Sequence, residues 1–194
     1  ITAQELLSVL IKRESRSVDM AHRAKQTAGL VLRYAIASGR TERDVSQDLL
    51  GALKLKSTKN LAAITSPSEV GILMEAIDGY RGTLVVKTAL SLSALLFQRP
   101  GEIRHMEWVE INWDENRWEI PASKMKMKSD HIVPLSTKAR TLLSELFKLT
   151  GRGKYVFPSA RGGSRPLSEN GVRTALRAMG YDNNTMTPHG FRSM

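Results

Sequence analysis

Residues 82–102 read GTLVVKTALSLSALLFQRPGE, and this stretch defines the centre of a hydrophobic core. From 82 to 98, nearly every side of a helix would be apolar or small, which predicts a central helix buried on all faces. Pro100 ends that helix because proline interrupts the backbone hydrogen-bond ladder. Arg99 is therefore expected at the mouth of the core. Glu102, three residues further on, is spaced either to pair with Arg99 or to orient it toward a ligand.

The first 63 residues are expected to be helical, because apolar side chains recur at helical spacing from 3 to 11 and again after Ser17. Ser17 is the expected N-cap of a long helix, and Gly39 can follow its last turn. A third, short helix is predicted to begin at Thr41. The predicted apolar side of the long helix comprises Met20, Ala24, Thr27, Val31 and Ala35.

Residues 54–60 are polar and basic and are interpreted as a linker. The linker separates an N-terminal domain, 1–63, from a C-terminal domain, 64–194. Its lysines are candidate DNA contacts if the segment crosses a phosphate backbone, and ordinary solvated residues if it is a plain surface loop. These lysines are Lys54, Lys56 and Lys59.

The second domain is predicted to mix helices with a small sheet. Ser66 to Glu69 read as a helix start with a capping box, and Gly79 ends that helix. Residues 109–113 and 117–120 alternate apolar and polar side chains around a turn, which predicts a hairpin, and 131–135 supply a third antiparallel strand. Further helices are expected from Ser136 and Ser168, separated by a loop at 159–166. The predicted fold class is α+β and mainly helical.

Composition excludes several classes of protein. The chain has 194 residues, of which 41% are hydrophobic and 25% charged, as in an ordinary globular protein. It contains no cysteine, which excludes a disulfide scaffold and a cysteine-bound zinc site and is compatible with the cytoplasm. The histidines lack metal-site spacing, and no apolar run reaches membrane-spanning length. We therefore expect neither a metal nor a membrane partner.

Positive charge is concentrated at the two ends of the chain. The formal net charge is +10. Residues 1–63 hold 11 basic against 6 acidic residues, 64–119 hold 5 against 9, and 120–194 hold 13 against 4. Two basic regions flanking an acidic middle are typical of a protein that binds a polyanion such as DNA, although solvated lysines alone also make proteins basic.

Four residues form a candidate site for a phosphodiester: Arg99, Lys126, His189 and Arg192. The run Thr-Pro-His-Gly-Phe-Arg, 187–192, predicts a helix start with Thr187 as N-cap, which would place His189 and Arg192 on one face. Two arginines, a lysine and a histidine suit the charge of a pentavalent phosphorane.

Other basic residues are candidate DNA contacts. Lys124 and Lys128 alternate with Lys126, so in an extended chain all three would point to the same side. Lys126 is the candidate for the phosphodiester site, and Lys124 is its competitor. The loop at 159–166 contributes Arg161 and Arg165, which either contact DNA or lie on an ordinary surface loop.

The chain resembles the tyrosine recombinases, or phage-type integrases, of prophages and genomic islands. The motifs are Arg-Pro-Gly-Glu at 99–102, a lysine eight residues before Pro134, and His-x-x-Arg at 189–192. The stretches 31–40 and 155–159 also resemble this family, so the resemblance covers essentially the whole chain. It implies a core-binding domain followed by a catalytic domain.

The resemblance also implies a mechanism. Arg99 and Arg192 would clamp the scissile phosphate, Lys126 would protonate the leaving 5′-hydroxyl, and His189 would assist proton transfer at a tyrosine nucleophile. A 3′-phosphotyrosyl link would conserve the bond energy, so no cofactor is expected. The partners would be double-stranded DNA attachment sites and a homotetramer in the synapse, with a monomer possible in free solution.

One feature departs from the family pattern. All four tyrosines, Tyr34, Tyr80, Tyr155 and Tyr181, precede the His-x-x-Arg motif, whereas the family's nucleophile follows it. We therefore expect a recombinase fragment, truncated at both ends and inactive by itself. The alternative is a non-catalytic DNA-binding remnant of an integrase. A metal-dependent nuclease is disfavoured because no acidic cluster accompanies the basic motifs.

Overall fold

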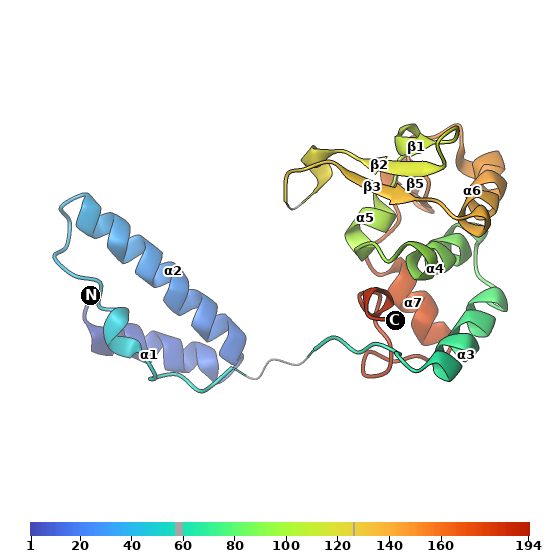
Figure 1. Cartoon of the computed structure of the whole chain (residues 1–194). Coiled ribbons are helices and arrows are strands. Elements are labelled where there is room, and N and C mark those ends of the chain that lie inside the picture. Colours follow the sequence, from blue (N-terminus) through green and yellow to red (C-terminus); the bar gives the residue numbers. More distant parts are fainter. Residues whose placement is uncertain (57–59, 126) are drawn as a thin grey trace. The chain divides into compact units, whose positions relative to one another are not determined.

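A computed structural model describes residues 1–56, 60–125 and 127–194. The described residues form two compact units, Ile1–Lys59 and Asn60–Met194 (Figure 1). The first unit is helical, and the second combines helices with two small antiparallel sheets. The predicted α+β class is confirmed.

The first unit packs two antiparallel helices and a 3-10 turn around a small apolar core. Its elements are α1 (Ala3–Glu14), α2 (Val18–Ala37) and η1 (Gln47–Leu49). Ser17 caps α2 as predicted, because its Oγ accepts a hydrogen bond from the Met20 amide at 3.3 Å. The buried core residues are Leu6, Leu10, Ala21, Leu49 and Leu53.

The buried side of α2 differs from the predicted one. Ala21 and Gly29 are buried, and Ala28 and Leu32 pack against the core. A Cβ on Gly29 would lie 2.8 Å from the Ser46 Oγ, so the chain after α2 approaches the helix at its small residues. The predicted side fails because α2 is apolar on more than one face and tertiary contact selects between them. Four of its members are exposed: Met20, Ala24, Thr27 and Val31.

The helix predicted from Thr41 does not form, and residues 41–46 adopt turns and irregular structure. Asp44 explains this local structure. Its carboxylate accepts from the Ser46 amide at 3.0 Å and pairs with Arg33 at 3.1 Å. An aspartate that binds the backbone two residues ahead stabilises a turn in competition with a helix.

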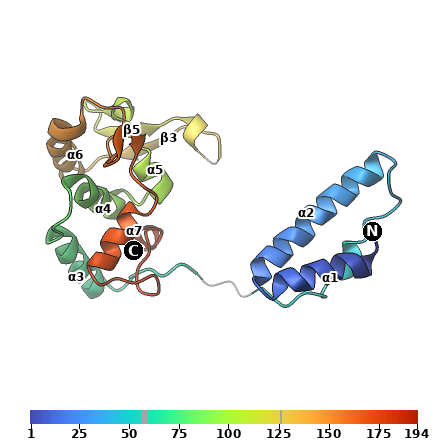
Figure 2. The ribbon, with the colours of Figure 1, turned by 180° about the vertical axis from the view of Figure 1, so that it is seen from behind.

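The second unit is built around α4 (Leu84–Leu96), the predicted central helix. Every residue from 88 to 94 is buried, which confirms that prediction. In Figures 1 and 2, α4 lies between the three-stranded sheet on one side and α3 and α7 on the other. The other helices and 3-10 turns are α3 (Pro67–Asp78), α5 (Pro100–Arg104), η2 (Trp108–Glu110), η3 (Ala122–Lys124), α6 (Thr137–Thr150), α7 (Gly171–Ala178) and η4 (Gly190–Arg192).

The three-stranded sheet has the predicted antiparallel order β1-β2-β3. Its strands are β1 (Ile111–Asn112), β2 (Arg117–Ile120) and β3 (His131–Pro134). Trp118 pairs with Ile111 on one side and Val133 on the other, and all three side chains are buried. The apolar side chains of the alternating pattern thus face the core of this unit.

Three local predictions in the second unit are wrong. The Ser66 Oγ contacts the Ser68 Oγ at 3.0 Å, in place of a capping box with Glu69. The expected loop at 159–166 is a hairpin of β4 (Pro158–Ser159) and β5 (Gly162–Pro166), held by pairing between segments that show no strand alternation. Helix α7 begins at Gly171, after the predicted Ser168, with Asn170 as N-cap.

Candidate functional site

Arg99 lies at the junction between the buried helix and a short second helix. Phe97 ends α4 in a left-handed conformation, with φ 55°, and Arg99 is the N-cap of α5. Its Nη1 donates to Glu102 Oε1 at 2.6 Å, and its backbone amide donates to Glu102 Oε2 at 2.8 Å. Glu102 is 8% exposed, whereas the Arg99 side chain is 39% exposed. A guanidinium has five N–H donors, so this pair orients Arg99 while most of its donors point elsewhere.

Arg192 is tied to the same junction from the far end of the sequence. Its Nε donates to the Phe97 carbonyl at 3.2 Å. That carbonyl belongs to the C-cap residue of α4, at the helix end where backbone carbonyls lack helical partners. Arg192 therefore contacts a residue that lies only two positions before Arg99.

His189 precedes η4 and is exposed. The α-helix predicted from Pro188 is replaced by a tighter 3-10 turn, Gly190–Arg192, in which residues three apart are stacked on one side. His189 lines a pocket of about 360 Å³ together with Pro100 and Gly101 of α5. The structure therefore gathers the Arg99 segment, His189 and Arg192 around the end of α4.

Residues 62–63 hold the His-x-x-Arg segment in place. The amide and the Oγ of Thr187 both donate to the Ala62 carbonyl, at 3.1 and 3.0 Å. Thr187 Oγ1 in turn accepts from the Gly190 amide at 3.1 Å. The N-cap of η4 is nevertheless His189, so the prediction that Thr187 is the N-cap is wrong. A Cβ on Gly190 would lie 2.6 Å from the Ala62 carbonyl oxygen. Glycine is needed here because backbone passes directly over it.

Lys126, the predicted general acid, lies outside the described residues. Its competitor Lys124 ends η3 and turns into the body of the unit. The Lys124 Nζ donates to Glu107 Oε1 at 2.6 Å, to the His105 carbonyl at 3.1 Å, and also to Glu110. The predicted extended chain is therefore wrong at this point, because a 3-10 turn redirects Lys124.

The charge of Lys124 is stabilised by its carboxylate partners. Burial disfavours the charged form, but hydrogen bonds to Glu107 and Glu110 and their negative charges outweigh it, so the pKa of Lys124 is raised. Burial likewise opposes the charge of Glu107, yet Lys124 and Lys154 hold the pKa of Glu107 below its usual value. The pair is therefore ionised at neutral pH.

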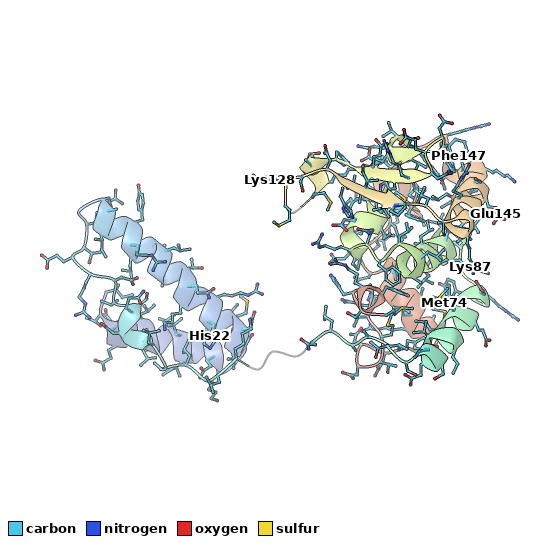
Figure 3. All side chains as sticks on the ribbon, viewed as in Figure 1. His22, Met74, Lys87, Lys128, Glu145 and Phe147 are labelled. Carbon is cyan, nitrogen blue, oxygen red and sulfur yellow. The ribbon has the colours of Figure 1, made fainter. Side chains whose placement is uncertain are left out.

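The remaining predicted DNA contacts occupy varied positions. Lys128 is exposed, has φ 52°, and lies at the end of the β2–β3 hairpin remote from α6 (Figure 3). Arg161 and Arg165 are exposed on the β4–β5 hairpin. Lys54 is exposed and Lys56 pairs with Asp19, while Lys59 lies outside the described residues.

Sequence reasoning did not single out three basic residues around His189. Arg104, His105 and Arg173 line the same pocket, with Glu169 as an acidic neighbour. Arg173 and Arg177 are four residues apart on α7, and this spacing was a readable signal. His105 carried no comparable signal, because its position depends on α5 packing beside the 187–189 segment.

The described part of the chain lacks two features. Within it, no three histidine or acidic side chains gather in an arrangement that would hold a metal ion. Among the same residues, no helix has both the length and the apolar content required to cross a bilayer.

The chain belongs to the phage integrase family. Residues 64–194 match the model of the phage integrase family, and residues 1–52 match that of the phage integrase central domain. The resemblance seen in the sequence is thereby confirmed.

Individual relatives agree with this assignment. The integrase of Enterobacteria phage P4 is 35% identical over 189 residues, which cover 91% of this chain and 43% of that protein. A lambda integrase dimer bound to a COC′ core site matches the fold with a TM-score of 0.73 at 20% identity, covering 100% of this chain and 55% of that one. A lambda integrase tetramer bound to a Holliday junction gives a TM-score of 0.72 at 20% identity, covering 100% and 58%. The chain thus spans about half the length of these relatives.

Proposed function

We propose that this chain is the phosphate-binding part of a tyrosine-type site-specific DNA recombinase. In this proposal residues 1–63 belong to the core-binding domain and 64–194 to the catalytic domain. The observation that supports it is that the His-x-x-Arg segment packs beside the segment that carries Arg99: Arg192 bonds to the Phe97 carbonyl, and His189 lines a pocket with Pro100 and Gly101. Glu102 orients Arg99 at the same junction. Membership of the phage integrase family supports the same chemistry.

Each side chain has a defined task in this reaction. Arg99 and Arg192 donate to the non-bridging oxygens of the scissile phosphate and stabilise the charge that builds up during attack. A tyrosine Oη forms a bond to phosphorus while the bond to the 5′-oxygen breaks. The leaving oxygen takes a proton, which we assign to Lys126, and His189 assists removal of the tyrosine proton. Attack by a 5′-hydroxyl on the phosphotyrosyl link reverses these steps and reseals a strand.

We propose that the nucleophile lies outside these 194 residues. What supports this is that all four tyrosines precede the His-x-x-Arg motif, whereas the nucleophile of the family follows it. This chain alone should therefore bind DNA without cutting it.

The proposed partners are duplex DNA attachment sites and further copies of the same protein. Net positive charge in residues 1–63 and 120–194 supports DNA contact from both regions. The lambda integrase structures, a dimer on a core site and a tetramer on a Holliday junction, support a homotetramer in the synapse. A monomer in free solution is part of the same proposal.

The test is covalent capture. The complete gene product is incubated with a nicked suicide substrate that bears its attachment site. The amount of covalent protein–DNA adduct is then quantified on a denaturing gel. We expect an adduct from the complete protein and none from residues 1–194. Arg99→Ala and Arg192→Ala should abolish the adduct, while Arg140→Ala, which removes an exposed arginine of α6, should retain it. Specific DNA binding by the complete protein without any adduct would instead identify a non-catalytic DNA-binding remnant.

A further inference from the structure

Lys124 joins two parts of the second unit that are separate in sequence. It ends η3, in the connection between β2 and β3, and its Nζ reaches the His105–Glu110 segment between α5 and β1. The Lys124 side chain is 29% exposed, and its two carboxylate partners are 13% and 6% exposed. Hydrogen-bonded ion pairs of this kind hold a defined geometry, unlike pairs on open surface.

Both carboxylates also make contacts with residues other than Lys124. Glu110 Oε2 accepts from Trp118 Nε1 at 3.0 Å and from the Glu107 amide at 3.1 Å. Glu107 also pairs with Lys154 at 3.5 Å. Trp118 is 1% exposed in the middle of β2, so Glu110 is held against the core of the unit. Glu107 and Glu110 thus form an acidic cradle for Lys124 that other residues help to hold.

This cradle is connected to the arginine site through one short helix. Arg99 is the N-cap of α5 and His105 is its C-cap, and the carbonyl of His105 accepts from the Lys124 Nζ. Glu102, which orients Arg99, lines a pocket of about 290 Å³ with Glu107, Glu110 and Lys124. The position of the β2–β3 connection relative to Arg99 therefore depends on five helical residues and one lysine.

We propose that Lys124 is a positioning residue, which anchors the connection between β2 and β3 to α5 and so sets the distance between that connection and the phosphate bound by Arg99. The inference rests on the proposed recombinase function, and it favours Lys126 over Lys124 as the proton donor. In this role Lys124 contacts neither DNA nor the reacting atoms.

The electrostatics of Lys124 agree with a structural task. Its carboxylate partners raise its pKa, and a proton held more tightly is transferred less readily to a leaving oxygen. Arginine can form the same ion pairs but does not lose its proton at any working pH. Substitution by arginine therefore separates anchoring from proton donation.

The experiment compares Lys124→Arg, Lys124→Ala and Lys126→Arg in the complete gene product. Single-turnover cleavage of the suicide substrate is measured at saturating DNA, together with DNA affinity. We expect Lys124→Ala to slow cleavage roughly 100-fold, the effect of misplacing a reacting group by about 1 Å. Lys124→Arg should restore the rate to within about threefold of wild type, whereas Lys126→Arg should not cleave. DNA affinity should change less than about twofold in Lys124→Ala, and Lys138→Ala on α6 serves as the matched control.

A second measurement does not depend on catalysis. Amide hydrogen exchange of β2 and β3 in the 194-residue chain should become faster in Lys124→Ala and stay at the wild-type rate in Lys124→Arg. If the wild-type protein forms no adduct, the proposed function fails, and the exchange data still decide whether Lys124 is an anchor. Lys124→Arg as slow in cleavage as Lys124→Ala, with unchanged exchange in both, would overturn the anchor and make Lys124 a proton donor or phosphate ligand. Wild-type cleavage and exchange in Lys124→Ala would overturn it as well.

Discussion

Replacing Gly190 with alanine tests whether close backbone packing holds the His-x-x-Arg segment. The added Cβ would lie 2.6 Å from the Ala62 oxygen, 2.9 Å from the Met186 Sδ and 3.0 Å from the Ala63 Cα. The Met186 sulfur can move with its side chain, but the two backbone atoms can move only if residues 62–63 shift. Such a shift weakens both hydrogen bonds from Thr187 to Ala62.

The expected loss of unfolding free energy follows from these contacts. Forcing an extra methyl group into a packed site costs about 1–3 kcal/mol. Each weakened hydrogen bond adds up to about 1 kcal/mol. We therefore expect Gly190→Ala to lower the free energy of unfolding by about 2–4 kcal/mol. At about 3 °C per kcal/mol, the melting temperature should fall by roughly 6–12 °C.

Urea unfolding followed by tryptophan fluorescence is the direct assay. All three tryptophans, Trp108, Trp113 and Trp118, lie in the second unit, so the signal reports that unit alone. The matched control is Gly163→Ala on β5, where an added Cβ meets no atom of the described structure within 4 Å. The control should change stability by less than about 0.5 kcal/mol. Equal stability of Gly190→Ala and the control would refute the packing argument.

Three further predictions use other parts of the chain. Gly71→Ala should stabilise the second unit by about 0.5–1 kcal/mol in the same urea assay, because Gly71 is exposed inside α3 and a Cβ there meets no described atom within 4 Å; a loss of stability would contradict this. The pKa of Glu107 is lowered in the folded state, so its contribution to stability is complete above about pH 4.5 and disappears as the pH falls through the folded value. Urea midpoints between about pH 6 and pH 3 should accordingly fall less steeply in Glu107→Gln than in wild type, and parallel curves would disprove the assignment. Duplex DNA binding by the 194-residue chain, measured by fluorescence anisotropy, should weaken with salt at a log–log slope of roughly −4 to −5 if about five phosphates are neutralised; a flat profile would exclude electrostatic contact from its basic regions.

The sequence alone predicted those parts of the structure that depend on residues close together along the chain. The apolar run at 82–98 predicted the buried helix, because a helix without a polar face has to be surrounded by other elements. Alternation around 114–116 predicted the antiparallel sheet, because side chains in a strand face opposite sides in turn. Ser17 and Gly79 marked helix ends through local backbone chemistry. The family motifs also named Arg99, His189 and Arg192 as candidate site residues.

Only the tertiary structure decided which of several compatible surfaces are used. Tertiary contact selects the buried side of α2. It also joins Arg192 to the Phe97 carbonyl and brings residues 62–63 against Gly190, and these segments are far apart in sequence. Lys124 shows the reason most directly. In the sequence it is one of three similar lysines, but η3 turns its side chain toward Glu107 and Glu110. Spacing along a chain specifies which residues can share a face, whereas the free energy of burying and pairing them is determined by the elements packed against that face.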